Sequence, residues 1–168
     1  MSAPVSEKTR VDLEAFVANE YPKVVAAVGL ITGNRQDAAD AVQDALVGFL
    51  SSPPSREVDN LAAWITVVAS NRLRDRSRRT AAESRALAKL GHADDSVTDE
   101  LTVLDIDVRA ALLELPLQQR LVCILHYLMD QSIETIAVGL GVSTGTIKTQ
   151  LHRARTRLSS RLERGDLR

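Results

Sequence analysis

The feature of this chain that most constrains its fold is the spacing of its apolar residues, which follows the period of an α-helix almost throughout. In residues 36–50, for example, Ala38, Ala41, Ala45 and Phe49 recur three or four positions apart, which places their side chains on one helix face. No run alternates apolar and polar residues between turn signals, as a half-buried strand would. The sequence therefore predicts an all-α protein.

Residues that cap or interrupt helices predict where the helices end. Residues 33–34, Gly-Asn, separate the helix over 36–50 from an earlier apolar stretch. Two prolines in 51–55 end that helix, because proline lacks a backbone N–H and restricts its predecessor. Asn60 is a suitable N-cap for the next helix, which continues into an arginine-rich segment, residues 72–79.

The net charge of −1, from 21 basic and 22 acidic residues, hides blocks of opposite charge. The net charge is −4 over residues 1–71, +4 over 72–79, −5 over 80–108 and +4 over 109–168. Segregated charge of this kind predicts that different segments bind different partners. A total near zero therefore does not exclude binding to nucleic acid.

An acidic stretch divides the chain into two predicted domains. Residues 91–107 contain six carboxylates and no Lys or Arg, a composition that favours a flexible linker over a packed segment. We expect compact helical domains over residues 1–90 and 108–168, the second opening with a helix from Val108 to Leu115.

The C-terminal domain carries the signals of a helix-turn-helix. Ser132 and Ser143 each precede an amphipathic stretch as N-caps, and Gly141 between the stretches suits a tight turn. Two short helices joined in this way are typical of DNA-binding proteins, in which the second helix enters the major groove. The residues expected on its DNA-facing side are Lys148, Thr149, His152, Arg153 and Arg155.

Several classes of function are disfavoured by the same sequence. The chain shows no nucleophile elbow and no glycine-rich phosphate loop, so we expect neither an enzyme nor a cofactor. Its single cysteine, Cys123, cannot form an internal disulfide, and the cysteine and histidines lack metal-ligand spacing. There is no apolar run of about 20 residues and no signal-peptide core, so we expect a cytoplasmic protein without membrane contact of its own.

Two strings of residues, in this order along the chain, resemble motifs of the bacterial sigma factors of RNA polymerase, most closely the extracytoplasmic-function (ECF) group of the sigma-70 family. Residues 37–44, Asp-Ala-Ala-Asp-Ala-Val-Gln-Asp, and the segment from Trp64 to Arg78 resemble sigma region 2. Residues 136–155, with Gly141-Val142-Ser143 at the turn, resemble sigma region 4. The resemblance implies an alternative sigma factor that binds core polymerase and directs promoter-specific initiation of transcription.

The resemblance also implies a role for each charged block. The residues that would dock on the clamp helices of the polymerase β′ subunit are Asp37, Asp40, Gln43 and Asp44. The residues that would meet the −10 promoter element are Asn71, Arg72, Arg74, Arg76, Arg78 and Arg79. The helix from 144 onward would read the −35 element, and region 4 would contact the polymerase β flap.

Three further features follow from the resemblance. The segment 51–59 lies where the family places a loop that captures a promoter base, although here it is rich in Pro and Ser and lacks aromatic residues. The acidic linker would occupy the nucleic-acid channel of the polymerase, where its carboxylates imitate phosphates. An anti-sigma factor that clamps both domains would be a further partner.

Two alternatives to a sigma factor remain open at this stage. A stand-alone helix-turn-helix regulator would share the signals of residues 132–158, but would usually carry an α/β sensor domain where residues 1–90 are predicted to be helical. A structural or interaction protein could use its basic stretches to bind RNA or acidic partners.

Overall fold

A computed structural model describes residues 7–84 and 105–165 of the chain. All regular secondary structure in these two ranges is helical, which confirms the predicted all-α class. The chain divides into two compact units, Met1–Val97 and Thr98–Arg168, and each is described by itself. Most of the predicted linker, residues 91–104, lies outside the described residues.

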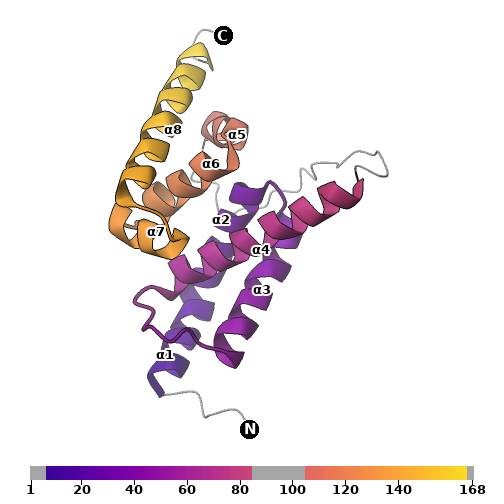
Figure 1. The fold of residues 1–168 in the computed structure, drawn as a ribbon, viewed down its shortest axis with the longest axis vertical. Helices are drawn as coiled ribbons and strands as arrows, with labels where there is room; N and C mark the ends of the chain where they lie inside the picture. The colour runs from indigo at the N-terminus through magenta and orange to yellow at the C-terminus, as the bar shows by residue number, and fades with distance from the viewer. Residues whose placement is uncertain (1–6, 85–104, 166–168) are drawn as a thin grey trace. The chain divides into compact units, whose positions relative to one another are not determined.

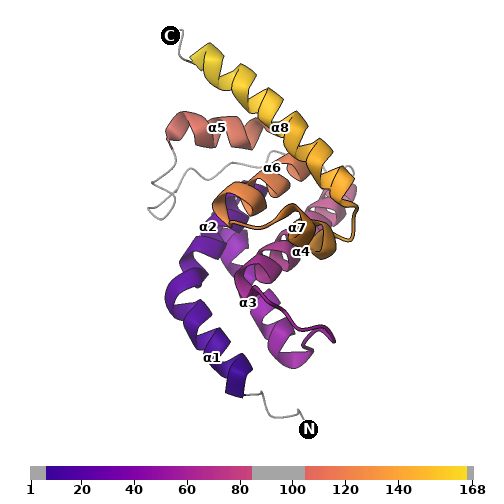
Figure 2. The same ribbon diagram turned by 90° about the vertical axis from the view of Figure 1, so that its left-hand side faces the viewer.

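Over its described residues, 7–84, the first unit contains four α-helices and one π-helical turn. In chain order these are α1 (Glu7–Ala15), η1 (Phe16–Glu20), α2 (Tyr21–Thr32), α3 (Arg35–Ser51) and α4 (Leu61–Ser84). The π-helical turn joins α1 to α2, so that the two helices follow one another along a bent path (Figure 2).

The predicted helix boundaries of the first unit are confirmed by its capping groups. Gly33 ends α2 in the left-handed conformation, with φ 78°, a region that glycine enters without steric cost. The Asn34 side chain accepts a hydrogen bond from the backbone N–H of Asp37 at 3.1 Å. Asn60 caps α4 in the same way, accepting from the N–H of Ala63 at 2.8 Å.

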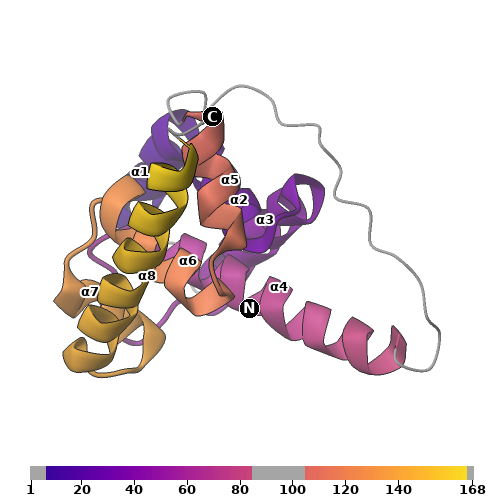
Figure 3. The same ribbon diagram turned by 90° about the horizontal axis from the view of Figure 1, so that it is seen from above.

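Small residues let the helices of the first unit pack closely. The face of α3 that is buried against α2 and α4 contains Ala38, Ala41, Val42 and Ala45. The buried face of α4 ends at Leu73. Beyond this residue the helix leaves the core, and its C-terminal half projects past α2 and α3 (Figures 1 and 3).

The second unit is built from shorter helices around the long C-terminal helix. Its elements are α5 (Ile106–Glu114), α6 (Leu117–Cys123), the π-helical turn η2 (Ile124–Leu128), α7 (Ile133–Leu140) and α8 (Thr144–Gly165). The core lies between α8 and the other helices, and its largest fully buried side chains include Ile124, Leu125, Ile136, Ile147 and Leu151.

The first helix of this unit begins earlier than predicted. We expected it to start at Val108, but α5 starts at Ile106, because the Asp105 side chain caps it by accepting from the N–H of Asp107 at 2.9 Å. The helix ends at Glu114, where Leu115 is extended ahead of a proline. Arg120 then donates hydrogen bonds to the carbonyls of residues 113 and 115, at 2.6 and 3.0 Å.

The predicted helix-turn-helix is confirmed in α7 and α8. The Ser132 hydroxyl accepts from the N–H of Thr135 at 3.0 Å, and the Ser143 hydroxyl accepts from the N–H of Thr146 at 3.1 Å. Between the helices Gly141 has a φ of 67°, as the turn requires. These local groups set the direction in which α8 leaves α7.

Replacing Gly141 with alanine tests the turn. A Cβ at this position meets no neighbour, but the left-handed backbone is strained for an L-residue, so we expect G141A to lower the free energy of unfolding by about 1–2 kcal/mol. Gly139 lies on the exposed part of α7 without a positive φ. The control G139A should leave stability unchanged or raise it by up to about 1 kcal/mol. Urea unfolding of both variants measures the difference, and equal effects would contradict the assigned turn.

Candidate nucleic-acid and protein interfaces

The outer face of α3 brings together three of the four acidic or amide residues predicted for polymerase binding. Asp40, Gln43 and Asp44 are exposed on the side opposite the core, and Gln43 donates a hydrogen bond to the hydroxyl of Tyr21 at 3.4 Å. Asp37 differs, because its carboxylate accepts from the Asn34 amide at 2.8 Å and is partly buried. Asp37 therefore also holds the N-cap residue of α3 in place.

An exposed valine, which the sequence did not single out, lies at the C-terminal end of the same face. Val47 is 61% exposed and follows Gln43 and Asp44 by four and three positions, so the three side chains are neighbours on the helix. A side chain of this kind with polar neighbours is typical of the centre of a protein interface. We call Asp40, Gln43, Asp44 and Val47 the α3 face.

The arginine-rich segment of α4 divides into two stripes. At about 100° per residue, one stripe contains Asn71, Arg74 and Arg78 and the other contains Arg72, Arg76 and Arg79. Asp75 lies between the two. A DNA strand that follows one side of the helix can therefore contact only part of the set that the sequence grouped together.

Arg72 is further distinguished by its contact with α3. Its guanidinium Nη2 lies 2.8 Å from the position that a Cβ on Gly48 would occupy. The side chain therefore extends across α3 at the one residue of that helix turn that has no side chain of its own.

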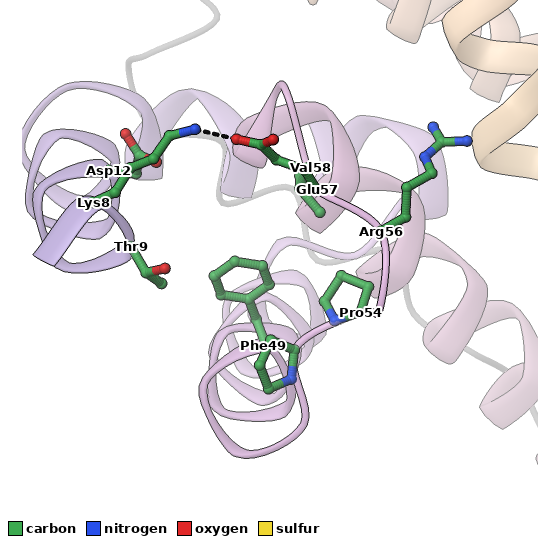
Figure 4. Close-up of a pocket in the computed structure, with 9 residues that line it drawn as sticks. Lys8, Thr9, Asp12, Phe49, Pro54, Arg56, Glu57 and Val58 are labelled. Atoms are coloured by element: carbon green, nitrogen blue, oxygen red, sulfur yellow. Dashed lines mark hydrogen bonds and ion pairs between the residues drawn. The ribbon is translucent and has the colours of Figure 1, made fainter. Parts of the chain in front are cut away.

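A pocket of about 250 Å³ lies among the first turns of α1, the end of α3 and the loop before α4 (Figure 4). The ring of Phe49 and the loop residue Pro54 form apolar walls, and Thr9 and Asp12 supply polar groups from α1. Phe49 provides an aromatic group that the loop itself lacks, and its ring packs against that of Trp64 with centroids 5.4 Å apart. Phe49 was not predicted as part of this site, because in the sequence this residue precedes the loop.

An ion pair joins the two sides of this pocket. Lys8 on α1 binds Glu57 in the loop (Figure 4). The hydrogen bond and charge of Glu57 raise the pKa of Lys8, and those of Lys8 lower the pKa of Glu57. Both groups are solvent-exposed, so the pair orients the loop more than it stabilises the fold.

The outer face of α8 exposes the residues that were predicted to contact DNA. Ile147, Leu151 and Ala154 are buried, and the exposed residues include Lys148, Thr149, His152, Arg153 and Arg155. The Thr149 hydroxyl donates to the carbonyl of Gly145 at 2.9 Å. Arg155 donates to the hydroxyl of Tyr127 at 3.3 Å, which turns its guanidinium toward η2.

Other kinds of site receive no support from the described residues. Within residues 7–84 and 105–165, no group of three or more His, Cys, Asp or Glu side chains could hold a metal ion. Cys123 is buried, and burial raises the pKa of its thiol to about 11. No helix in the described part of the chain is long and apolar enough to cross a membrane.

Comparison with known proteins places these surfaces in a family. The model for sigma-70 region 2 matches residues 16–83, and the model for sigma-70 region 4 matches residues 105–158. The ECF RNA polymerase sigma factor EcfG of Rhodopseudomonas palustris is 33% identical over 164 residues, covering 95% of this chain and 87% of the relative. The chain belongs to the ECF sigma factors of the sigma-70 family.

Other relatives agree with this assignment. The ECF sigma factor SigM of Mycobacterium tuberculosis is 33% identical over 132 residues, which cover 77% of this chain and 66% of the relative. The sigma factor RpoE of Bartonella quintana, solved in complex with the anti-sigma factor NepR, has a TM-score of 0.76 at 27% identity, covering 92% of this chain and 97% of that one. The chain is an alternative sigma factor that directs transcription, as predicted, and its family is not one of enzymes.

The orientation of two arginines on α8 yields a prediction for this sigma factor. Arg155 is held by its hydrogen bond to Tyr127, whereas Arg153 is exposed on the outer face of α8, and we expect Arg153 to be the arginine that reaches a base edge of the −35 element. R153A should reduce discrimination at one base pair by about 1–3 kcal/mol. R155A should weaken binding to all −35 sequences to a similar extent. Holoenzyme binding to a set of single-base −35 variants measures both, and uniform losses for R153A would mark it as a phosphate contact.

Proposed function

We propose that this sigma factor separates its polymerase contacts from its promoter contacts by placing them on different helices and different helix sides. The observation that carries the proposal is the split between the acidic and apolar α3 face and the basic residues of α4 and α8. In this proposal α3 binds the β′ clamp helices, α4 meets the −10 element, and α8 reads the −35 element.

The α3 face is suited to a basic partner helix. Asp40 and Asp44 are exposed carboxylates one helical turn apart, and Val47 offers an apolar contact beside them. Opposite charges on the two partners increase the association rate and fix the register, while the apolar contact of Val47 adds affinity. This arrangement favours a clamp helix with basic residues flanking an apolar position.

The stripe of α4 formed by Asn71, Arg74 and Arg78 is our candidate for the −10 contact. An amide side chain can pair with a base edge, and the guanidinium groups can bind phosphates. The pocket beside Phe49 would hold a base that leaves the stack during melting, since an aromatic ring can stack on any base face and polar groups of α1 and the loop line the rest of the pocket. The loop resemblance and the pocket support this assignment together.

The remaining partner assignments extend the same proposal. We propose that region 4 contacts the β flap, that the acidic residues between the units lie in the nucleic-acid channel, and that the protein acts in the cytoplasm without catalysing a reaction. The complex of RpoE with NepR supports regulation of this chain by an anti-sigma protein. A stand-alone regulator is disfavoured, because the region 2 match would then have no role.

Run-off transcription with core polymerase tests the proposed function. We expect initiation at a cognate promoter only when the protein is added. The double variant D40N/D44N should weaken core binding by roughly tenfold or more, with most of the loss in the association rate. The control D130N removes a carboxylate from the second unit, at a residue with φ 52° that Asn also tolerates. Core binding by D40N/D44N equal to that of D130N would contradict docking through α3.

Substitutions of Phe49 test the pocket. A base stacked on this ring should lose about 1–3 kcal/mol of binding when the ring is removed. We therefore expect F49L to slow promoter opening and F49Y to retain it, because only tyrosine keeps the aromatic face. The fluorescence of 2-aminopurine placed along the −10 element reports the unstacked base. Opening rates that are the same for F49L and F49Y would exclude stacking on Phe49.

A further inference from the structure

Arg72 occupies a different surface from the arginines that lie on the Asn71 side of α4. It is displaced from Asn71 by one residue, about 100° around the helix, and its side chain extends over α3. The guanidinium Nη2 and Cζ lie 2.8 and 3.8 Å from the position that a Cβ on Gly48 would take. The sequence grouped Arg72 with the DNA contacts, but its side chain is directed toward α3.

The guanidinium of Arg72 lies directly against Gly48, and we describe the arginine in this position as seated over Gly48. A Cβ at position 48 would lie 2.8 Å from the guanidinium Nη2, so any larger residue would push the flexible end of Arg72 away from its present position. Glycine within a helix costs roughly 0.5–1 kcal/mol relative to alanine, and Gly48, in the last turn of α3, does not have a positive φ. The close approach of Arg72 supplies a physical reason for glycine at this position.

The seated guanidinium continues the α3 face. Asp40, Asp44 and Gly48 succeed one another at intervals of four residues, so they form one line along the helix. Val47 lies beside the end of this line and is exposed. Along α3 the outer surface therefore changes from two carboxylates, through an apolar side chain, to the positive charge of Arg72.

We propose that Arg72, seated over Gly48, belongs to the polymerase-docking surface and binds a carboxylate of core polymerase, rather than the −10 DNA. This inference rests on the proposed docking of the α3 face. A guanidinium binds a carboxylate through two parallel hydrogen bonds. A surface that is negative at one end and positive at the other accepts a partner helix in one direction only, so Arg72 fixes the orientation of docking.

A double-mutant cycle between Gly48 and Arg72 tests the inference, with core polymerase affinity as the measurement. R72A should weaken core binding about tenfold. G48A keeps every charge but displaces the guanidinium, and should cause a loss of similar size. In the R72A background G48A should have no further effect beyond about twofold, because the two changes remove the same contact. G48A favours helix formation, and circular dichroism verifies that both variants remain folded.

Two comparison variants separate the polymerase contact from a DNA contact. R10A removes a charge paired with Glu14 on α1 and should leave core affinity unchanged. R78A should leave core affinity unchanged but weaken promoter binding by the holoenzyme and reduce its salt dependence by about one ion. R72A should leave that salt dependence unchanged.

Each outcome decides between the two roles of Arg72. Unchanged core affinity in R72A or in G48A, or a lower salt dependence of promoter binding in R72A, would overturn the inference. Additive losses in the double variant would show that Gly48 does not act through Arg72 and would also overturn it. Failure of the unmodified protein to bind core polymerase would instead reject the proposed function, so the two failures are distinguishable.

Discussion

The packing of α4 against α2 and α3 is the constraint on which the first unit depends. The buried face of α4 runs from Ala62 to Leu73, and the small residues of α3 let the two helices approach closely. Beyond Leu73, no other helix among the described residues of the first unit covers α4, and Arg76, Arg78 and Arg79 are exposed. One helix is therefore fixed by the core at its start and exposed at its end, which makes a rigid support for the proposed promoter contacts.

In the second unit, α8 is likewise fixed on one side and exposed on the other, and capping groups and a buried stripe of residues hold it in place. Ser132, Gly141 and Ser143 determine the turn between α7 and α8, and Ile147 and Leu151 anchor α8 in the core. The opposite side of α8 is then necessarily exposed. Side chains on a rigid helix lose less conformational entropy on binding than those on a loop, which favours a defined contact with DNA.

Many features of both units could be predicted from the sequence, because they depend on neighbouring residues. The break at Gly33-Asn34, the caps at Asn60, Ser132 and Ser143 and the turn at Gly141 were predicted and are confirmed. The start of α5 was placed two residues too late, because the Asp105 cap lies within an acidic stretch that resembles a linker. Nothing in the apolar spacing predicted the π-helical turns.

The candidate surfaces show which features the sequence alone determines and which it does not. It determined the helical class, the order of the acidic and basic segments, and the resemblance to sigma regions 2 and 4, since these depend on composition and spacing along the chain. Only the tertiary structure placed Phe49 in a pocket with residues of α1 and laid the side chain of Arg72 over Gly48. These contacts join residues up to 49 positions apart, as in the ion pair of Lys8 with Glu57 at the same pocket. They depend on how the helices cross, which local patterns do not specify.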